Sequence, residues 1–164
     1  MLSRFAKVTP EGEYIPPNKK ELKMVYASML TLRVFFTAYS THYTASAATV
    51  AVRYSVQRTQ FKKGKGSDEE RKILDYQNQQ AKLFPIVASV FAFSISSFKI
   101  RTDYNNFMES VTGAQVKDGF KKGAFRLLPD LHSSASCLKA FMSDLTLEHI
   151  NTAWHACGGH GFLK

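Results

Sequence analysis

The 164-residue chain has little cysteine, proline or tryptophan: two Cys, five Pro and one Trp. Cys137 and Cys157 form neither a C-x-x-C pair nor the dense set of a secreted disulfide scaffold, which favours a reducing compartment. A composition of 45% hydrophobic and 21% charged residues excludes an intrinsically disordered chain. At this length we expect room for one ordinary domain.

No uninterrupted apolar run is present that would suit a lipid bilayer, where a spanning helix needs ~20 predominantly apolar residues. Two stretches without charge, 34–52 and 83–98, contain repeated hydroxyl residues, and the second contains Pro85. Both are interpreted as helices buried in protein. We therefore expect no transmembrane segment.

Acidic residues are also scarce, with 13 Asp and Glu against 22 Lys and Arg, for a net charge of +9. This excess predicts an anionic partner: a nucleic acid, an acidic membrane or the phosphates of a cofactor. The cations are scattered along the chain and lack the interleaved aromatics of a nucleic-acid-binding motif. No nucleic acid is therefore expected as a partner.

Strand-like alternation and internal repeats are absent, whereas helical spacing is frequent. Residues 1–18 hold three of the five prolines and a turn-like segment at 9–12, so they are interpreted as an extended lead-in. Residues 19–164 are interpreted as a helical bundle domain. The predicted fold is all-α: an antiparallel bundle of three to four long helices.

Three stripes of core-type residues at alternating spacings of four and three predict the buried face of each helix. The first helix is expected to bend near 38–44, the second to kink at Pro85, and the third to run from Asp130 to a stop at Gly158 and Gly159. The stripes are Val25, Met29, Leu32, Phe36, Tyr39, Tyr43, Ala47, Val50, Tyr54 and Phe61; Leu74, Ala81, Phe84, Ala88, Phe91, Ile95 and Phe98; and Leu131, Ala135, Leu138, Met142, Leu145, His149, Thr152 and Ala156.

Two segments could carry chemistry. Residues 154–162 hold three glycines at a helix end, which would let a phosphate or another backbone approach closely; the ordinary alternative is a helix cap and turn. His155, Cys157 and His160 lack a fourth ligand for zinc, so no metal is expected. In residues 53–61, two arginines could form a fork for a phosphate, or could simply place charge at a helix end.

Taken together, five segments resemble acyl-CoA oxidases of the acyl-CoA dehydrogenase and oxidase superfamily, in the C-terminal α-helical region. Their order and spacing match as well, and the opening residues 2–8 and 11–14 resemble the segment leading into that region. The five segments are RYSVQRTQF (53–61), ILDYQNQQAKLFP (73–85), LPDLH (128–132), LKAF (138–141) and ACGGHGF (156–162).

The resemblance implies a flavoenzyme of fatty-acid β-oxidation that uses FAD and oxygen to convert a fatty acyl-CoA to trans-2-enoyl-CoA and hydrogen peroxide. It implies a peroxisomal location, with a mitochondrial one as the alternative, and a homodimer or larger assembly. Arg58, Phe61 and Gln77 stand at the family's contacts to the adenosine and pyrophosphate of FAD. Gly158 and Gly159 match its glycine turn, and His155 stands where the dehydrogenases often carry glutamine.

The chain also departs from the family. The family's general base is a glutamate in a segment like Phe-Glu-Gly-Glu-Asn downstream of the glycine turn, and the sequence stops at Lys164 before any such segment. No catalytic residue is therefore assigned, and the chain is expected to be inactive alone. Two hypotheses remain: part of an FAD-dependent oxidase that supplies flavin-binding and dimer-interface helices, or a non-catalytic helical assembly subunit derived from such an oxidase.

Overall fold

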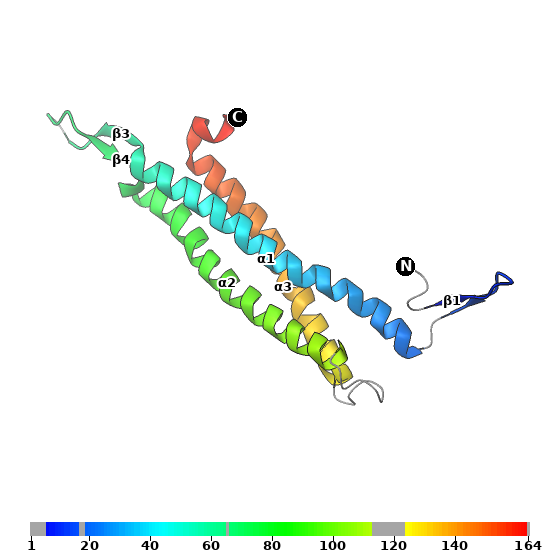
Figure 1. Ribbon diagram of the computed structural model, residues 1–164. Helices are drawn as coiled ribbons and strands as arrows, with labels where there is room; N and C mark the ends of the chain where they lie inside the picture. The colour runs from blue at the N-terminus through cyan, green and yellow to red at the C-terminus, as the bar shows by residue number, and fades with distance from the viewer. Residues whose placement is uncertain (1–5, 17–18, 65, 113–123, 164) are drawn as a thin grey trace.

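The computed structural model describes residues 6–16, 19–64, 66–112 and 124–163. Three long helices, α1 (Lys19–Gln57), α2 (Gln77–Thr112) and α3 (Ala124–Ala156), lie side by side in an elongated up-down-up bundle (Figure 1). Each helix contacts the other two. The predicted all-α antiparallel bundle is confirmed, with three long helices in the described part of the chain.

Two small hairpins, which the sequence did not predict, flank α1. Strands β1 (Lys7–Val8) and β2 (Tyr14–Ile15) pair antiparallel, as do β3 (Thr59–Lys62) and β4 (Glu70–Lys72). The predicted turn at 9–12 is confirmed, because the Gly12 N–H donates to the Thr9 carbonyl over 3.0 Å. Strands of two to four residues are too short for their alternation to be recognised in a sequence.

Helices α1 and α2 are unbroken at the two positions where the sequence predicts a bend or a kink. Helix α1 runs without interruption through 38–44, where hydroxyls bond back to carbonyls of the same helix, such as Thr41 to Thr37 over 2.9 Å. Helix α2 continues through Pro85. The expected start of α3 at Asp130 is wrong: α3 begins at Ala124 and contains Pro129.

The buried face was predicted correctly for α3 and wrongly for α1 and α2. On α3, Leu131, Ala135, Met142, His149 and Ala156 are buried as expected. The predicted stripes of α1 and α2 instead point outward in large part, with exposed fractions of 48–72%. These exposed residues, called here the outer stripes, are Met29, Leu32, Phe36, Tyr39, Tyr43 and Val50 on α1, and Phe84, Phe91, Ile95 and Phe98 on α2. Val25 lies outside the described side chains.

The side chains that α1 buries are smaller than those of its outer stripe. The inner face of α1 alternates aliphatic and hydroxyl residues, including Leu30, Val34, Thr37 and Thr44, all buried. Since α1 and α2 carry apolar residues on more than one side of the helix axis, the largest residues do not identify the face that packs in the bundle. The expectation that 83–98 is a buried helix is therefore correct only for its inner face.

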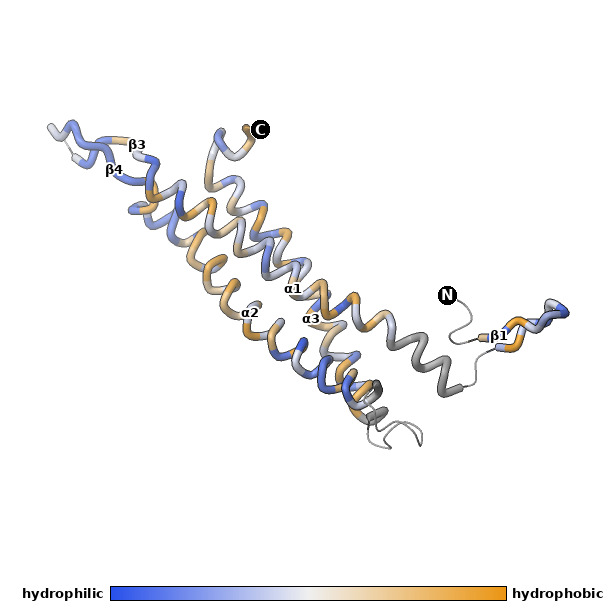
Figure 2. The backbone as a smooth tube through the Cα atoms, viewed as in Figure 1, coloured by the Kyte–Doolittle hydropathy of each residue, from blue (hydrophilic) through white to orange (hydrophobic). Residues whose placement is uncertain are grey.

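Helix α2 has the composition of a possible membrane span as a result. Residues Gln77–Ser110 have a hydropathy of 1.8, and only 22% of the apolar window is buried. Among the described residues this is the one helix long and apolar enough to cross a membrane. Figure 2 shows the hydrophobic colouring over the part of α2 nearer β4, with hydrophilic colouring toward its other end. Because soluble core helices pass the same test, the exposure of α2 establishes only that no described residue of this chain covers its outer face.

The core has two apolar clusters joined by a polar centre. One cluster contains Leu30, Val34, Ile100, Phe107, Leu131 and Ala135; the other contains Ala48, Ala51, Leu83, Ile86, Ala153, Ala156 and Cys157. Hydroxyl and imidazole groups bond across helices between them: Thr44 to Thr146 over 3.0 Å and His149 to Ser89 over 2.8 Å. Every buried side-chain polar atom in the described residues has a partner. The second cluster forms the base of the pocket described next.

Candidate cofactor site

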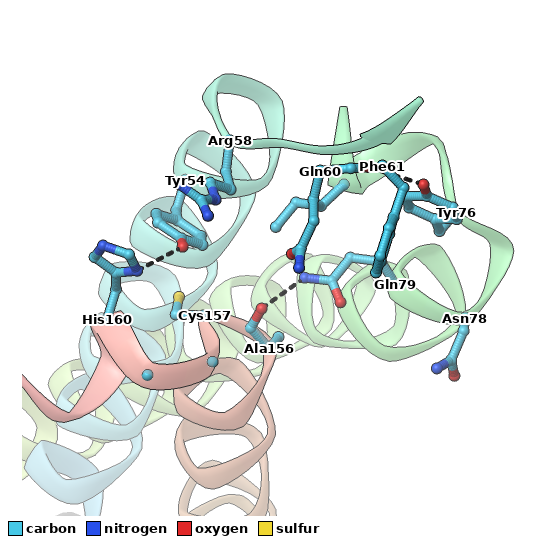
Figure 3. Close-up of a pocket in the computed structure, with 13 residues that line it drawn as sticks. Tyr54, Arg58, Gln60, Phe61, Tyr76, Asn78, Gln79, Ala156, Cys157 and His160 are labelled. Atoms are coloured by element: carbon cyan, nitrogen blue, oxygen red, sulfur yellow. Dashed lines mark hydrogen bonds between the residues drawn. The ribbon is translucent and has the colours of Figure 1, made fainter. Parts of the chain in front are cut away.

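A pocket of about 560 Å³ opens where the end of α1, the start of α2 and the end of α3 meet (Figure 3). Its wall combines aromatic rings, amides, one arginine and a glycine turn. The lining residues are Tyr54, Arg58, Gln60, Phe61, Ile73, Tyr76, Asn78, Gln79, Ala156, Cys157, Gly158, Gly159 and His160.

Arg58 is held at the pocket by its backbone. Its N–H donates to the Tyr54 carbonyl over 2.8 Å and so extends the last turn of α1, while its carbonyl accepts from Ile73 N–H over 2.9 Å. Ile73 begins the short 3-10 helix η2 (Ile73–Asp75) that precedes α2. The guanidinium forms no ion pair with any residue in the described ranges. The pocket therefore presents a positive charge on a fixed backbone.

The glycine turn faces the same pocket. Helix α3 ends at Ala156, Cys157 N–H donates to the Trp154 carbonyl over 3.1 Å, and Gly158 has φ +59°. This left-handed conformation favours glycine, so the predicted stop is confirmed. A Cβ built on Gly158 or Gly159 would meet no atom within 4 Å. The turn thus offers open backbone to a ligand.

The chain then continues in the 3-10 helix η4 (Gly158–Phe162), which folds back on Trp154. The indole N–H of Trp154 donates to the Gly161 carbonyl, and the ring centroids of Trp154 and Phe162 lie 4.7 Å apart. A Cβ on Gly161 would lie 2.5 Å from Cδ1 of Trp154. Gly161 is therefore needed for close approach to the indole.

Polar side chains connect the segments around the pocket. The Tyr54 hydroxyl and His160 Nδ1 lie 3.0 Å apart, with their ring centroids 5.6 Å apart. Tyr76 donates its hydroxyl to the Gln60 carbonyl over 2.9 Å. Gln79, on the first turn of α2, donates to α1 and to α3. These contacts were not predicted.

Cys157 belongs to the apolar base of the pocket. It is buried, and desolvation raises the pKa of its thiol. A raised pKa keeps the sulfur protonated, so Cys157 serves as a small apolar wall residue rather than a nucleophile. Cys137, the other free cysteine, is exposed on α3.

The structure gathers four of the six predicted site residues. Arg58, Phe61, Gly158 and Gly159 line the pocket, and Phe61 is 70% exposed with φ +65°. The other two, Gln77 and His155, are exposed and not among the lining residues. His155 donates from Nδ1 to the Asn151 carbonyl over 2.6 Å, and its ring lies 6.0 Å from that of Phe162.

Sequence signals for the remaining lining residues were weak. Gln79 lies in a run of amides, Gln77 to Gln80, whose spacing does not distinguish one member from another. Tyr54 belonged to a stripe interpreted as core. Within the described residues, no group of three His, Cys, Asp or Glu side chains is placed to hold a metal ion.

A bundle whose helix ends enclose a cationic, glycine-lined pocket defines an all-α domain suited to binding an anionic ligand. The chain belongs to the acyl-CoA oxidase family: the family model for the acyl-CoA oxidase C-alpha1 domain matches residues 26–164. The resemblance inferred from the sequence is thereby confirmed.

Similar proteins extend this match to nearly the whole chain. Peroxisomal acyl-coenzyme A oxidase 1 of Dictyostelium discoideum is 34% identical over 164 residues, covering 100% of this chain and 22% of that protein. The structure of Arabidopsis thaliana acyl-CoA oxidase 1 has a TM-score of 0.77 and 31% identity, covering 98% and 22%. The Caenorhabditis elegans acyl-CoA oxidase-1 complexed with FAD and ATP has a TM-score of 0.75 and 30% identity, covering 99% and 21%. This chain thus spans about a fifth of the length of these relatives.

Proposed function

We propose that this chain forms part of an FAD-dependent acyl-CoA oxidase that converts fatty acyl-CoA to trans-2-enoyl-CoA and hydrogen peroxide. The observation that carries the proposal is the pocket in which Arg58 and the Gly158–Gly159 turn meet, in a chain of the acyl-CoA oxidase C-alpha1 family. The similar C. elegans structure, which contains FAD, supports the cofactor assignment.

The lining residues fit a flavin dinucleotide. FAD carries a pyrophosphate, which suits the open backbone of Gly158 and Gly159 and the guanidinium of Arg58, which forms no ion pair within the described residues. Its flat rings suit an exposed aromatic such as Phe61. When bound, FAD would accept a hydride, and Arg58, Phe61 and the Gly158–Gly159 turn would hold and orient it. Gln77 and His155, both outside this pocket, are proposed as contacts in the assembled oxidase.

The side chains of the pocket are suited to binding a ligand and not to abstracting a proton from the substrate. Abstraction of a proton from the carbon α to the thioester needs a base within hydrogen-bond reach of ~3 Å. The described lining contains no carboxylate: it consists of arginine, amides, aromatics, one isoleucine, small residues, a protonated thiol and His160, whose Nδ1 lies 3.0 Å from the Tyr54 hydroxyl. We therefore propose that proton abstraction belongs to a glutamate of another segment, as the family resemblance implies.

The outer stripes support assembly. Large apolar side chains exposed along α1 and α2 favour association with other protein surfaces. We propose that other parts of the oxidase and a second subunit cover them, in a homodimer or larger assembly. A peroxisomal location is proposed because the Dictyostelium and human relatives are named peroxisomal enzymes.

Substitution of Arg58 tests the cofactor assignment. Charge-assisted hydrogen bonds contribute ~1.5–3 kcal/mol, so Arg58→Ala in the full-length oxidase should weaken FAD binding about tenfold to a hundredfold. Arg53→Ala is the matched control, since Arg53 is exposed near the end of α1 and does not line the pocket. Equal FAD dissociation constants for the two variants, measured by flavin fluorescence, would remove Arg58 from the site.

A further inference from the structure

Gln79 ties the ends of the three helices together at the pocket. It lies on the first turn of α2, and its Nε2 donates to Ser55 Oγ of α1 over 3.0 Å and to the Ala156 carbonyl of α3 over 2.8 Å. A glutamine amide has two N–H groups, and in Gln79 both donate to these two partners. Figure 3 shows the bond from Gln79 to Ala156 at the base of the pocket.

Both partners lie next to the residues that face the ligand. Ser55 is one turn before Arg58 and has 0% exposure; its hydroxyl donates to the Ala51 carbonyl over 2.7 Å, which leaves its oxygen to accept from Gln79. Ala156 is the last residue of α3 and is followed by Cys157 and the glycine turn. One amide therefore connects the segment of Arg58 with the segment of the turn.

The bond to Ala156 also satisfies a carbonyl at the end of α3. The last four carbonyls of an α-helix have no partner within the helix. Ala156 is buried, so its carbonyl has limited access to water, and Gln79 supplies the donor. Without that donor the end of α3 loses a fixed position relative to α1.

We infer that Gln79 is a positioning residue for the cofactor: it sets the distance between Arg58 and the Gly158–Gly159 turn without contacting the reacting atoms. This inference rests on the proposed function for its ligand, whereas the tie itself can be tested without FAD. The neighbouring Gln80 provides a matched control. Its Nε2 donates over 3.0 Å to the Leu74 carbonyl, a partner six residues away in the sequence, and its side chain bonds to no described residue of α1 or α3.

The first experiment measures the alkylation of the two free thiols in the 164-residue chain. Cys157 is buried at the end of α3 and Cys137 is exposed, so Cys137 serves as an internal reference. Gln79→Met keeps the side-chain length but removes both donors. It should speed labelling of Cys157 about tenfold, while Gln80→Met changes it less than about twofold. Equal Cys157 labelling in the two variants would overturn the tie.

The second experiment measures FAD affinity in the full-length oxidase, well below the melting temperature. At such a temperature, a loss of fold stability alone does not change the dissociation constant of the folded protein. Gln79→Met should bind FAD about tenfold more weakly than Gln80→Met. FAD affinity unchanged despite faster Cys157 labelling would overturn the positioning role. A wild-type oxidase that does not bind FAD would instead overturn the proposed function. The rate of Cys157 alkylation would still test whether Gln79 holds the ends of α1 and α3 together.

Discussion

Two adjacent residues of α2, Leu83 and Phe84, lie on its inner face and its outer stripe, respectively. Leu83 is 0% exposed in the cluster at the base of the pocket, whereas Phe84 is 56% exposed. Leu→Ala substitutions in cores cost about 2–5 kcal/mol, from lost burial plus the cavity left behind. Several neighbours of Leu83 in the cluster are alanines, whose methyl groups cannot extend into the space. We therefore expect Leu83→Ala to lower the unfolding free energy by about 3–5 kcal/mol.

Phe84→Ala removes a larger side chain but should cost about 1 kcal/mol or less, because most of that side chain already contacts solvent. Urea unfolding followed by circular dichroism gives both values from the midpoints and slopes. The measurement is made at several low concentrations, so that self-association through the outer stripes does not add to the stability. A cost for Phe84→Ala equal to that for Leu83→Ala would show that the inner and outer faces have been assigned incorrectly.

Three further outcomes are expected. Burial lowers the pKa of His149, against a smaller opposing effect of Glu148, so the unfolded chain binds the proton first as pH falls below about 6.5. The unfolding free energy should therefore fall between pH 7 and pH 5, and His149→Gln should flatten this dependence in urea titrations. Sedimentation of the 164-residue chain should show association that Phe91→Ser and Ile95→Ser reduce; a monodisperse monomer at high concentration would contradict this. Incubated with FAD and a saturated acyl-CoA in air, the chain alone should form no hydrogen peroxide or enoyl-CoA above a flavin-only control.

Helical periodicity was sufficient to predict the bundle but not the packing of each helix. On α3, where Leu131, Ala135 and Met142 share one face, the stripe and the core coincide. On α1, Phe36 and Tyr39 are larger than Thr37 and Thr44, yet the threonines are buried, with Thr44 bonded to Thr146 across the interface. Hydrophobicity alone cannot anticipate this choice, since it depends on which partner each face meets.

The candidate site was predictable where local backbone chemistry determines the structure. Glycine at a helix end permits a left-handed conformation, and the sequence predicts this for Gly158. Gln79 was not, because its role depends on the relative position of Ser55 and Ala156, which are far apart along the chain. His155 and His160 stand on either side of the turn, and the direction of η4 decides that His160, not His155, reaches the pocket.

The alanines beneath the pocket act as spacers. Ala48 and Ala51 of α1 and Ala153 and Ala156 of α3 are buried in one cluster, and the distance between packed helices depends on the size of the side chains at their contact. Methyl groups allow the helices to approach closely, so we expect the side-chain size at these positions to influence the width of the pocket. A bulkier residue at Ala48, Ala51 or Ala153 would push the helices apart and move the arginine away from the glycine turn, although none of these three alanines lines the pocket. Ligand affinity should thus depend on three buried alanines that an inspection of the pocket lining alone would leave out.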